Sequence, residues 1–434
     1  MNLDSPWRAV RSLPPGCRPE LRRRAIFECC KWDPQVEDVD TLAPLAVVLK
    51  HSAWREMAAL SEALYAETLM LEEALILRPD LHRRLALPRK IRVVLAEEAE
   101  RLNKLKAAAE NPPHLRVMRF DFHPTHEGWR VSEVNSDVPG GYNEASGWSS
   151  LVAEHVTDAV LAGDPSRQLV LGIASRVPRG GTVALVHATA YTDDRQVMTY
   201  LARRLQQQGL CPVLVGPDHI RWKQGRAFLE TDWFTGPADF VFRFFPAEWL
   251  PNLGRLADWP RFFAGAASPL CNPATSLLTQ SKRWPLVLQD LGISLPTWRC
   301  LLPETRDPRD VDWKRDANWV LKPALGRVGE LVGLAGVTSA REWKVIRRSV
   351  RWGGRHWVAQ QRFTPTPIPV AGEAWHICFG VYVIDGRAAG IYGRVAAQPL
   401  INHAARDAAV LVESASTVIE SAIPSHTYES IGTL

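Results

Sequence analysis

Two short segments of alternating polar and apolar residues constrain the fold of this chain more than any other feature. They read Arg-Phe-Asp-Phe at 119–122 and Val-Ser-Glu-Val-Asn-Ser-Asp at 131–137, with a polar turn at 124–128 between them. Two segments of period two joined by a short turn predict a β-hairpin. Because alternate residues of a strand face the same side, one side of this hairpin would carry four polar side chains: Arg119, Asp121, Glu133 and Asn135.

These four side chains suit a magnesium site. Asp121, Glu133 and Asn135 supply two carboxylates and an amide oxygen, which are the hard ligands that Mg²⁺ takes, usually together with substrate phosphates. Arg119 is placed to hold an anion beside the metal. Each residue taken alone is equally well explained as an ordinary charged residue on a solvated hairpin, so the prediction depends on the whole pattern.

Composition excludes several classes of protein. The 434 residues carry a net charge of +5, from 52 basic and 47 acidic residues that are interspersed, so there is no basic footprint for nucleic acid. The seven cysteines are odd in number and lack Cys-x-x-Cys spacing, which predicts neither a disulfide framework nor a structural zinc site. No apolar run approaches the roughly 18 residues that a membrane span needs. We expect a cytoplasmic protein with no nucleic-acid or membrane partner.

The length allows two or three domains, and the residue patterns divide the chain into four parts. We predict a helical N-terminal region at 1–115, a hairpin region at 116–165, a parallel α/β substrate domain at 166–268, and a nucleotide-binding and lid region at 269–434.

Helices and strands are predicted within these parts from periodicity. Apolar residues at helical spacing indicate helices at about 52–77, 91–109 and 144–162. In the third part, strand, helix and strand alternate, which is typical of a parallel α/β unit. Asp193-Asp194 follows the first of these strands and fits a ligand site or a helix cap equally well.

Signals typical of nucleotide binding gather after residue 269. Lys322 lies near the end of a predicted strand that runs into the glycine-bearing loop 326–329. Glycines let backbone amides approach phosphate oxygens, and an arginine in the loop adds a guanidinium. Such a loop alone is usually a hairpin turn, but Lys322 and the upstream hairpin favour binding. An Asp-Gly turn at 385–386 predicts another hairpin, which carries Arg394.

The pattern Arg-x-Asp followed by Glu-x-Asn and a Pro-Gly turn at 139–141 resembles the metal-binding hairpin of ATP-grasp ligases. Its place ahead of the lysines, with Lys-Pro-x-x-Gly-Arg-x-Gly at 322–329 and Asp-Gly-x-x-Ala-Gly-Ile-x-x-Arg at 385–394, resembles the glutathionylspermidine synthase branch. The resemblance covers most of 29–412. It implies a mixed α+β and α/β fold with an ATP-grasp core and a small inserted α/β domain. The order of the core would be permuted, because most ATP-grasp enzymes carry this hairpin near the C-terminal end.

The resemblance also implies a role for each matched residue. Asp121, Glu133 and Asn135 would bind Mg²⁺, and Arg119 would stabilise the transition state. Arg394 would hold the acyl phosphate or the γ-phosphate. The remaining matched residues would bind ATP: Lys282 and Lys322 at the phosphates, Gln360 or Gln361 at the adenine hinge, and Gly326, Arg327 and Gly329 in the lid loop.

The implied activity is that of an ATP-dependent carboxylate–amine ligase. A carboxylate attacks the γ-phosphorus of ATP to give an acyl phosphate and ADP, and an amine then displaces phosphate to form an amide. The chain departs from the family at 138–142, where Val-Pro-Gly-Gly-Tyr replaces the small hydroxyl residues that hold a peptide carboxylate. The reaction type is therefore predicted, while the acid and the amine are left open.

Two other interpretations stay open. A catalytically silent ATP-grasp-like protein would bind a nucleotide or a partner, although all the expected charged positions are filled. A zinc hydrolase would use His123, His126 and Glu127, but a turn offers no helical face for two metal ligands.

Overall fold

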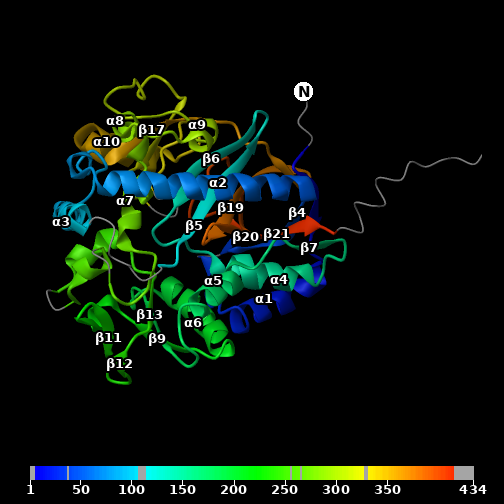
Figure 1. Cartoon of the computed structure of the whole chain (residues 1–434). Helices are drawn as coiled ribbons and strands as arrows, with labels where there is room; N and C mark the ends of the chain where they lie inside the picture. The colour runs from blue at the N-terminus through cyan, green and yellow to red at the C-terminus, as the bar shows by residue number, and fades with distance from the viewer. Residues whose placement is uncertain are drawn as a thin grey trace, which may run out of the picture.

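The computed structural model describes residues 5–36, 39–105, 114–254, 257–263, 266–326 and 331–414. Within these residues the fold is organised around a nine-stranded sheet (Figure 1). Seven strands follow one another in the order β1 (Trp7–Ser12), β4 (Leu42–Leu49), β21 (Arg406–Glu413), β20 (Arg387–Ala396), β19 (Glu373–Ile384), β5 (Val117–Thr125) and β6 (Gly128–Asn135). Two short strands pair with this series: β7 (Ala159–Leu161) with β21, and β18 (Ile368–Val370) with β19. The β4–β21 pair is parallel and the other pairs of this sheet are antiparallel.

Alternation along the central strands explains the layers around this sheet. In β19, Phe379 and Val381 pack on the face covered by α2 (His51–Ile76), whereas Tyr382 and Ile384 pack on the opposite face with α5 (Pro165–Ala174). The shorter helices α1 (Arg18–Phe27) and α4 (Ser149–Ala153) also lie on this second face. Figure 1 shows α2 running along the sheet on one side, and α5, α4 and α1 grouped on the other.

The prediction of a helical region at 1–115 is wrong in part. α2 and α3 (Arg89–Leu105) lie where helices were predicted, but β1 and β4 are strands of the central sheet. β4 consists of apolar residues with one proline and is almost entirely buried, as expected for a strand covered on both faces. The helix predicted at 144–162 is also shorter than expected, because the π-helical turn η3 (Asn143–Trp148) leads into α4 and the chain then forms β7.

A separate parallel sheet confirms the predicted strand–helix–strand pattern. Its order is β14 (Leu270–Cys271), β13 (Phe240–Arg243), β8 (Thr182–Val186) and β9 (Cys211–Val215), and α6 (Thr192–Gln207) connects β8 to β9. Between β9 and β13 the chain forms a small antiparallel sheet of β10 (Ile220–Lys223), β11 (Arg226–Glu230) and β12 (Thr235–Pro237). The domain boundaries themselves stay a prediction.

The nucleotide-binding segment contains a third antiparallel sheet, in the order β15 (Thr305–Arg306), β17 (Trp357–Gln361) and β16 (Trp319–Pro323). α10 (Ala340–Gly353) packs on it through Ile346 and Val350. The remaining short elements are β2 (Gln35–Val36), β3 (Val39–Asp40), α7 (Leu277–Gln280), α8 (Leu288–Leu291), α9 (Pro296–Leu301), and the 3₁₀ turns η1 (Pro15–Cys17), η2 (Pro79–Leu81), η4 (Pro217–His219), η5 (Ala247–Asn252), η7 (Trp259–Phe262), η8 (Ala274–Ser276), η9 (Trp284–Val287) and η10 (Gly354–His356).

All seven cysteines are free, as their odd number and spacing predicted. A search of the described helices for one that is both long and apolar enough to cross a membrane finds none.

Candidate functional site

The face of the central sheet opposite α2 borders a cavity of about 660 Å³. Eight predicted site residues line this cavity: Arg119, Asp121, Glu133, Asn135, Lys322, Gln360, Gln361 and Arg394. Lys282 lies in a smaller neighbouring pocket, which shares Glu133 and Gln360 with the cavity. The carbonyl oxygen of Gly326 accepts a hydrogen bond from Lys282 Nζ at 2.8 Å. The other two predicted loop residues, Arg327 and Gly329, lie outside the described residues.

A β-bulge in the predicted hairpin determines which side chains reach the cavity. Val131 and Val134 of β6 both lie in the apolar core, each opposite a phenylalanine of β5. The two residues between them, Ser132 and Glu133, oppose Asp121 alone and both line the cavity. The extra residue locally changes the direction of β6, so two consecutive side chains face the same space.

Arg119 and Asp121 form a buried ion pair in the cavity wall. Arg119 Nε lies 2.8 Å from Asp121 Oδ1 and Nη2 lies 3.1 Å from Oδ2, while Nη1 donates to the carbonyl oxygen of Gly140 at 2.6 Å. The guanidinium carbon lies 5.1 Å from the centre of the Tyr392 ring. Burial opposes the charged form, but the Asp121 carboxylate outweighs it and raises the pKa of Arg119. In this structure the anion that Arg119 holds is Asp121.

The predicted metal-binding residues Asp121, Glu133 and Asn135 border the same space. Asn135 Nδ2 donates to Asp121 Oδ2 at 3.2 Å. Carboxylate and amide oxygens of this kind fit Mg²⁺. They do not fit zinc as well, and within the described ranges no group of three or more His, Cys, Asp or Glu side chains is arranged to hold a metal.

The histidine of the zinc alternative has other contacts. His123 Nε2 lies 3.1 Å from Ser132 Oγ, and its ring lies 5.1 Å from that of Phe363. Burial, together with the charge of Lys322, lowers the pKa of His123 to about 3. Glu127 forms an ion pair with Arg130 at 2.8 Å in the turn.

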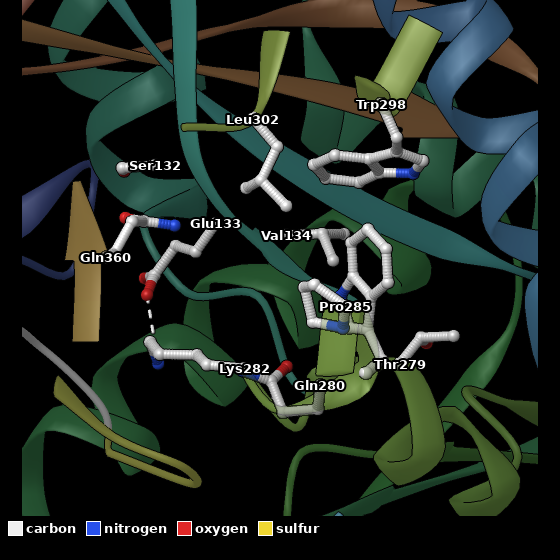
Figure 2. Close-up of a pocket in the computed structure, with 11 residues that line it drawn as sticks. Ser132, Glu133, Val134, Thr279, Gln280, Lys282, Pro285, Trp298, Leu302 and Gln360 are labelled. Carbon is white, nitrogen blue, oxygen red and sulfur yellow. Dashed lines mark ion pairs between the residues drawn. The ribbon is translucent and has the colours of Figure 1, made fainter. Parts of the chain in front are cut away.

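Lys282 reaches the hairpin from a distant part of the chain. Figure 2 shows its side chain extended toward Glu133, and Nζ lies 2.9 Å from Glu133 Oε2. Burial alone would raise the pKa of Glu133, but the ammonium groups of Lys282 and Lys322 hold it below its ordinary value. The pair therefore carries opposite charges inside the protein.

Lys322 lies at the end of β16 and is also buried. Its Nζ donates to Gln360 Oε1 at 2.7 Å and to the carbonyl oxygen of Ser132 at 3.3 Å. Burial lowers the pKa of Lys322 to about 8, although the Glu133 carboxylate opposes this shift. Gln360 Nε2 in turn lies 3.2 Å from Thr305 Oγ1, so the side chain of this predicted hinge residue is fixed on both sides.

The cavity is also lined by charged residues outside the predicted set, among them Lys31, Glu144 and Asp407. Lys31 Nζ lies 2.5 Å from Glu144 Oε1 and 3.1 Å from Asp407 Oδ2, and the Tyr392 hydroxyl donates to Asp407 Oδ1 at 2.6 Å. Burial would lower the pKa of Lys31, but the two carboxylates raise it. These residues lie far apart in the sequence, and the fold brings them together.

Asp193 and Asp194 also line the cavity. They lie in the first turn of α6, and Tyr191 occupies the N-cap position without a side-chain capping bond. The N-cap residue is therefore Tyr191 and not one of the aspartates, although two carboxylates in the first turn still favour the positive end of the helix. The interpretation of these two carboxylates as a ligand site stays a prediction.

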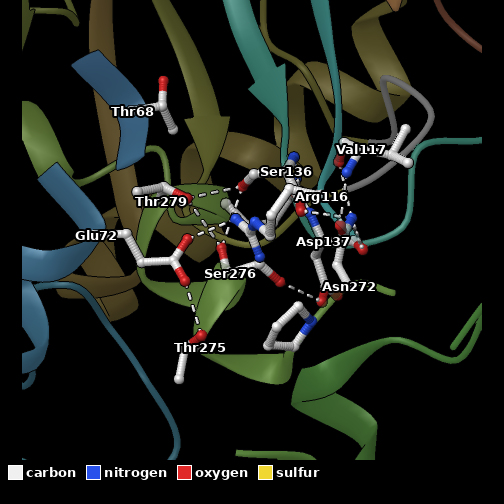
Figure 3. Close-up of polar contacts among 12 residues, drawn as sticks. Thr68, Glu72, Arg116, Val117, Ser136, Asp137, Asn272, Thr275, Ser276 and Thr279 are labelled. Atoms are coloured by element: carbon white, nitrogen blue, oxygen red, sulfur yellow. Dashed lines mark hydrogen bonds and ion pairs between the residues drawn. The ribbon is translucent and has the colours of Figure 1, made fainter. Parts of the chain in front are cut away.

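A polar network that includes Ser136, Asp137 and Asn272 fixes the end of the hairpin (Figure 3). Asp137, two residues after Asn135, is fully buried; its Oδ1 lies 2.5 Å from Arg243 Nη2, at the end of β13. Asn272 Nδ2 donates to the carbonyl oxygens of Val117 and Asp137, at 2.8 and 3.0 Å. The hairpin is thus attached to the parallel α/β sheet next to the predicted metal-binding residues.

The family model described as glutathionylspermidine synthase preATP-grasp matches residues 36–413. A comparison with curated proteins gave no match.

Three solved structures resemble the chain at low sequence identity. A glutathione synthetase-like effector from Globodera pallida has a TM-score of 0.58 at 10% identity, covering 93% of this chain and 100% of its own. A putative γ-glutamylcysteine synthetase from Methylobacillus flagellatus has a TM-score of 0.40 at 12% identity, covering 78% of this chain and 88% of its own. D-alanyl-alanine synthetase A from Vibrio cholerae has a TM-score of 0.30 at 10% identity, covering 55% of this chain and 89% of its own.

The first of these three structures shows that the chain shares the overall fold of a glutathione synthetase-like protein. The family model covers most of the chain and includes the hairpin, both lysines and Arg394. The chain belongs to the glutathionylspermidine synthase preATP-grasp family, a family of ATP-dependent ligases.

Proposed function

We propose that this protein is an ATP-dependent carboxylate–amine ligase that works through an acyl phosphate. The observation that carries the proposal is the convergence of six predicted site residues on one cavity, with Lys282 in the adjoining pocket; the six are Arg119, Asp121, Glu133, Asn135, Lys322 and Arg394. Family membership supports the same reaction class. The permuted order of an ATP-grasp core and the inserted α/β domain at 166–268 are part of this proposal.

The charges around the cavity suit phosphoryl transfer. In such reactions negative charge gathers on the transferring phosphoryl oxygens, so catalysis depends on positioning and positive charge. Lys282 and Lys322 would bind the phosphates of ATP, and Arg119 and Arg394 would hold the transferring group and the acyl phosphate. Gln360 or Gln361 would line the adenine site.

Asp121, Glu133 and Asn135 are the residues that would hold Mg²⁺. When bound there, Mg²⁺ would neutralise charge on the phosphate oxygens. In this structure Arg119 and Lys282 compensate the charges of Asp121 and Glu133, at 2.8 and 2.9 Å. Lys282 would exchange the Glu133 carboxylate for a phosphate oxygen when the nucleotide enters.

The identity of the acid and the amine is a separate matter. The family's description names glutathionylspermidine, which makes glutathione and spermidine the first probes. Val138, Gly140 and Gly141 line the cavity, however, and offer no side-chain hydroxyl to a peptide carboxylate. We therefore propose the reaction type and leave the substrate pair to experiment.

A screen for ADP release tests this proposal. The purified protein is given Mg²⁺ and ATP with pooled acids and amines that include glutathione and spermidine, and products are followed by mass spectrometry. A condensed mass that requires an acid and an amine, and that is lost in Glu133→Gln, supports a ligase. Tight Mg²⁺-dependent ATP binding without turnover of any pool would favour a silent nucleotide-binding protein, and no ATP binding would overturn both.

A further inference from the structure

Three cavity residues have a buried polar side-chain atom that lacks a hydrogen-bond partner within the described part of the chain. They are Thr41, through Oγ1, Glu144, through Oε2, and Arg394, through Nε. Glu144 offers a charged acceptor and Arg394 a charged donor, so these two have opposite charge. A buried polar atom without a partner costs free energy, so a ligand that supplies the missing partner is favoured at both places.

Glu144 is held in one orientation at its position. Its side chain is 9% exposed, and Lys31 Nζ lies 2.5 Å from Oε1. Lys31 is shared with Asp407, whose other oxygen accepts from Tyr392. Lys31 therefore fixes one oxygen of Glu144, a residue that lines the cavity, and Oε2 is the buried oxygen left without a partner.

The other carboxylates around the cavity are less suitable acceptors. Asp121 and Glu133 are the proposed metal ligands, and both oxygens of Asp407 already have partners. Asp33 and Asp193 line the cavity but are exposed to solvent, and Asp194 is only half-buried. Water inside a ligase site would compete with the amine for the acyl phosphate, so the proton acceptor is best placed where water is excluded. This favours the buried carboxylate of Glu144.

We propose that Glu144 is the general base for the amine, a role that rests on the ligase function proposed above. The neutral amine attacks the carbonyl carbon of the acyl phosphate. The C–N bond forms, the C–O bond to phosphate breaks, and its electron pair leaves with the phosphate. The proton that the nitrogen loses passes to Glu144 Oε2. Arg394 Nε, the open donor of the same cavity, binds an oxygen of the departing phosphate.

The experiment compares two nucleophiles in Glu144→Gln. Hydroxylamine, a weak base that is unprotonated at neutral pH, reacts with an acyl phosphate without a base and gives a hydroxamate. The second nucleophile is spermidine, or the amine that the ligase screen gives in its place. Both rates are measured with the same acid, and their ratio separates proton removal from activation of the acid.

A matched control is available on the adjoining helix. Glu154 ends α4, forms an exposed ion pair with Arg24 and does not line the cavity. Glu154→Gln should leave the ratio of amide to hydroxamate at the wild-type value. Glu144→Asp, which keeps a carboxylate, should recover part of the ratio that Glu144→Gln loses.

We expect the ratio of amide to hydroxamate to fall about 100-fold or more in Glu144→Gln, as for loss of a general base. A ratio within threefold of wild type overturns the assignment. A parallel loss of both products also overturns it, because Glu144 would then act in activation or folding. If the wild-type protein forms neither product with any acid, the ligase function itself fails, and this inference fails with it.

Discussion

The ion pair between Lys282 and Glu133 is reinforced by Gln280, two residues before the lysine. Gln280 Oε1 accepts hydrogen bonds from the backbone N–H groups of Ser136 and Asp137, at 3.0 and 3.1 Å. The segment that carries the lysine is therefore joined to the segment that carries the carboxylate at two successive places. This double attachment fixes the distance of 2.9 Å between Lys282 Nζ and Glu133 Oε2.

Gln280→Leu should weaken binding of Mg²⁺-ATP. The leucine leaves two buried N–H groups without an acceptor, at a cost of about 1–3 kcal/mol each, and loosens the segment that positions Lys282. We expect a loss of at least tenfold in affinity, measured by calorimetry with a non-hydrolysable ATP analogue. Gln289→Leu, the same change at an exposed position, is the control. Equal affinity in the two variants would contradict a positioning role for Gln280.

Gly380→Ala should impair catalysis through Arg119. Gly380 lies opposite Asp121 in the register of β19 and β5, and a Cβ there would come 2.7 Å from Arg119 Cδ. The arginine would have to move, and loss of one positioned donor typically lowers kcat by about 10²–10³-fold. Steady-state kinetics measure the effect. Gly353→Ala, where an added Cβ meets no atom within 4 Å, should keep wild-type kcat. Wild-type kcat in Gly380→Ala would contradict the assigned role of Arg119.

Affinity for ATP should fall above pH 8. Burial lowers the pKa of Lys322 to about 8, so this residue loses its positive charge about two units earlier than an ordinary lysine. The charged form, present below this pKa, is the one that attracts phosphate. We expect an affinity about tenfold weaker at pH 9.5 than at pH 7.5. Lys322→Arg, whose guanidinium stays charged, should show a flat profile; an identical profile in both proteins would argue against phosphate binding by Lys322.

Asp137→Ala should destabilise the fold strongly. The pair of Asp137 and Arg243 is fully buried, and removing one partner leaves an uncompensated charge at a cost of about 3–5 kcal/mol. The midpoint of urea unfolding measures this change. Glu20→Ala removes one partner of an ion pair that is more than half exposed, and should scarcely move the midpoint. Similar midpoints for both variants would show that the buried pair does not anchor the hairpin.

Local patterns were sufficient to predict several parts of this fold. The alternation of polar and apolar residues predicted the hairpin of 119–135, and the Asp-Gly turn at 385–386 predicted the hairpin of β19 and β20. The parallel strands β8, β9 and β13 were predicted because each is a short apolar run with a helix or a loop on either side, whereas the two-residue strand β14 was not predicted. In these cases the partner strands lie close together in the sequence or belong to the same strand–helix–strand segment.

Features that depend on distant pairing were not predictable in the same way. β4 lies beside β21, at the other end of the chain, and its apolar run alone does not identify that partner. Lys31 has no distinctive sequence context, although it meets Glu144 and Asp407 in the structure. Gly380 interrupts an apolar strand, which is typical of a site where another group approaches the backbone closely, but the sequence does not identify that group as Arg119.

The most direct test of the central claim follows oxygen atoms. An acid found by the screen is labelled with ¹⁸O in its carboxylate and incubated with the amine, Mg²⁺ and ATP. If the carboxylate attacks the γ-phosphorus, one labelled oxygen per turnover appears in inorganic phosphate, and ADP carries none. Label in AMP, or amide formation with unlabelled phosphate, would contradict an acyl-phosphate ligase.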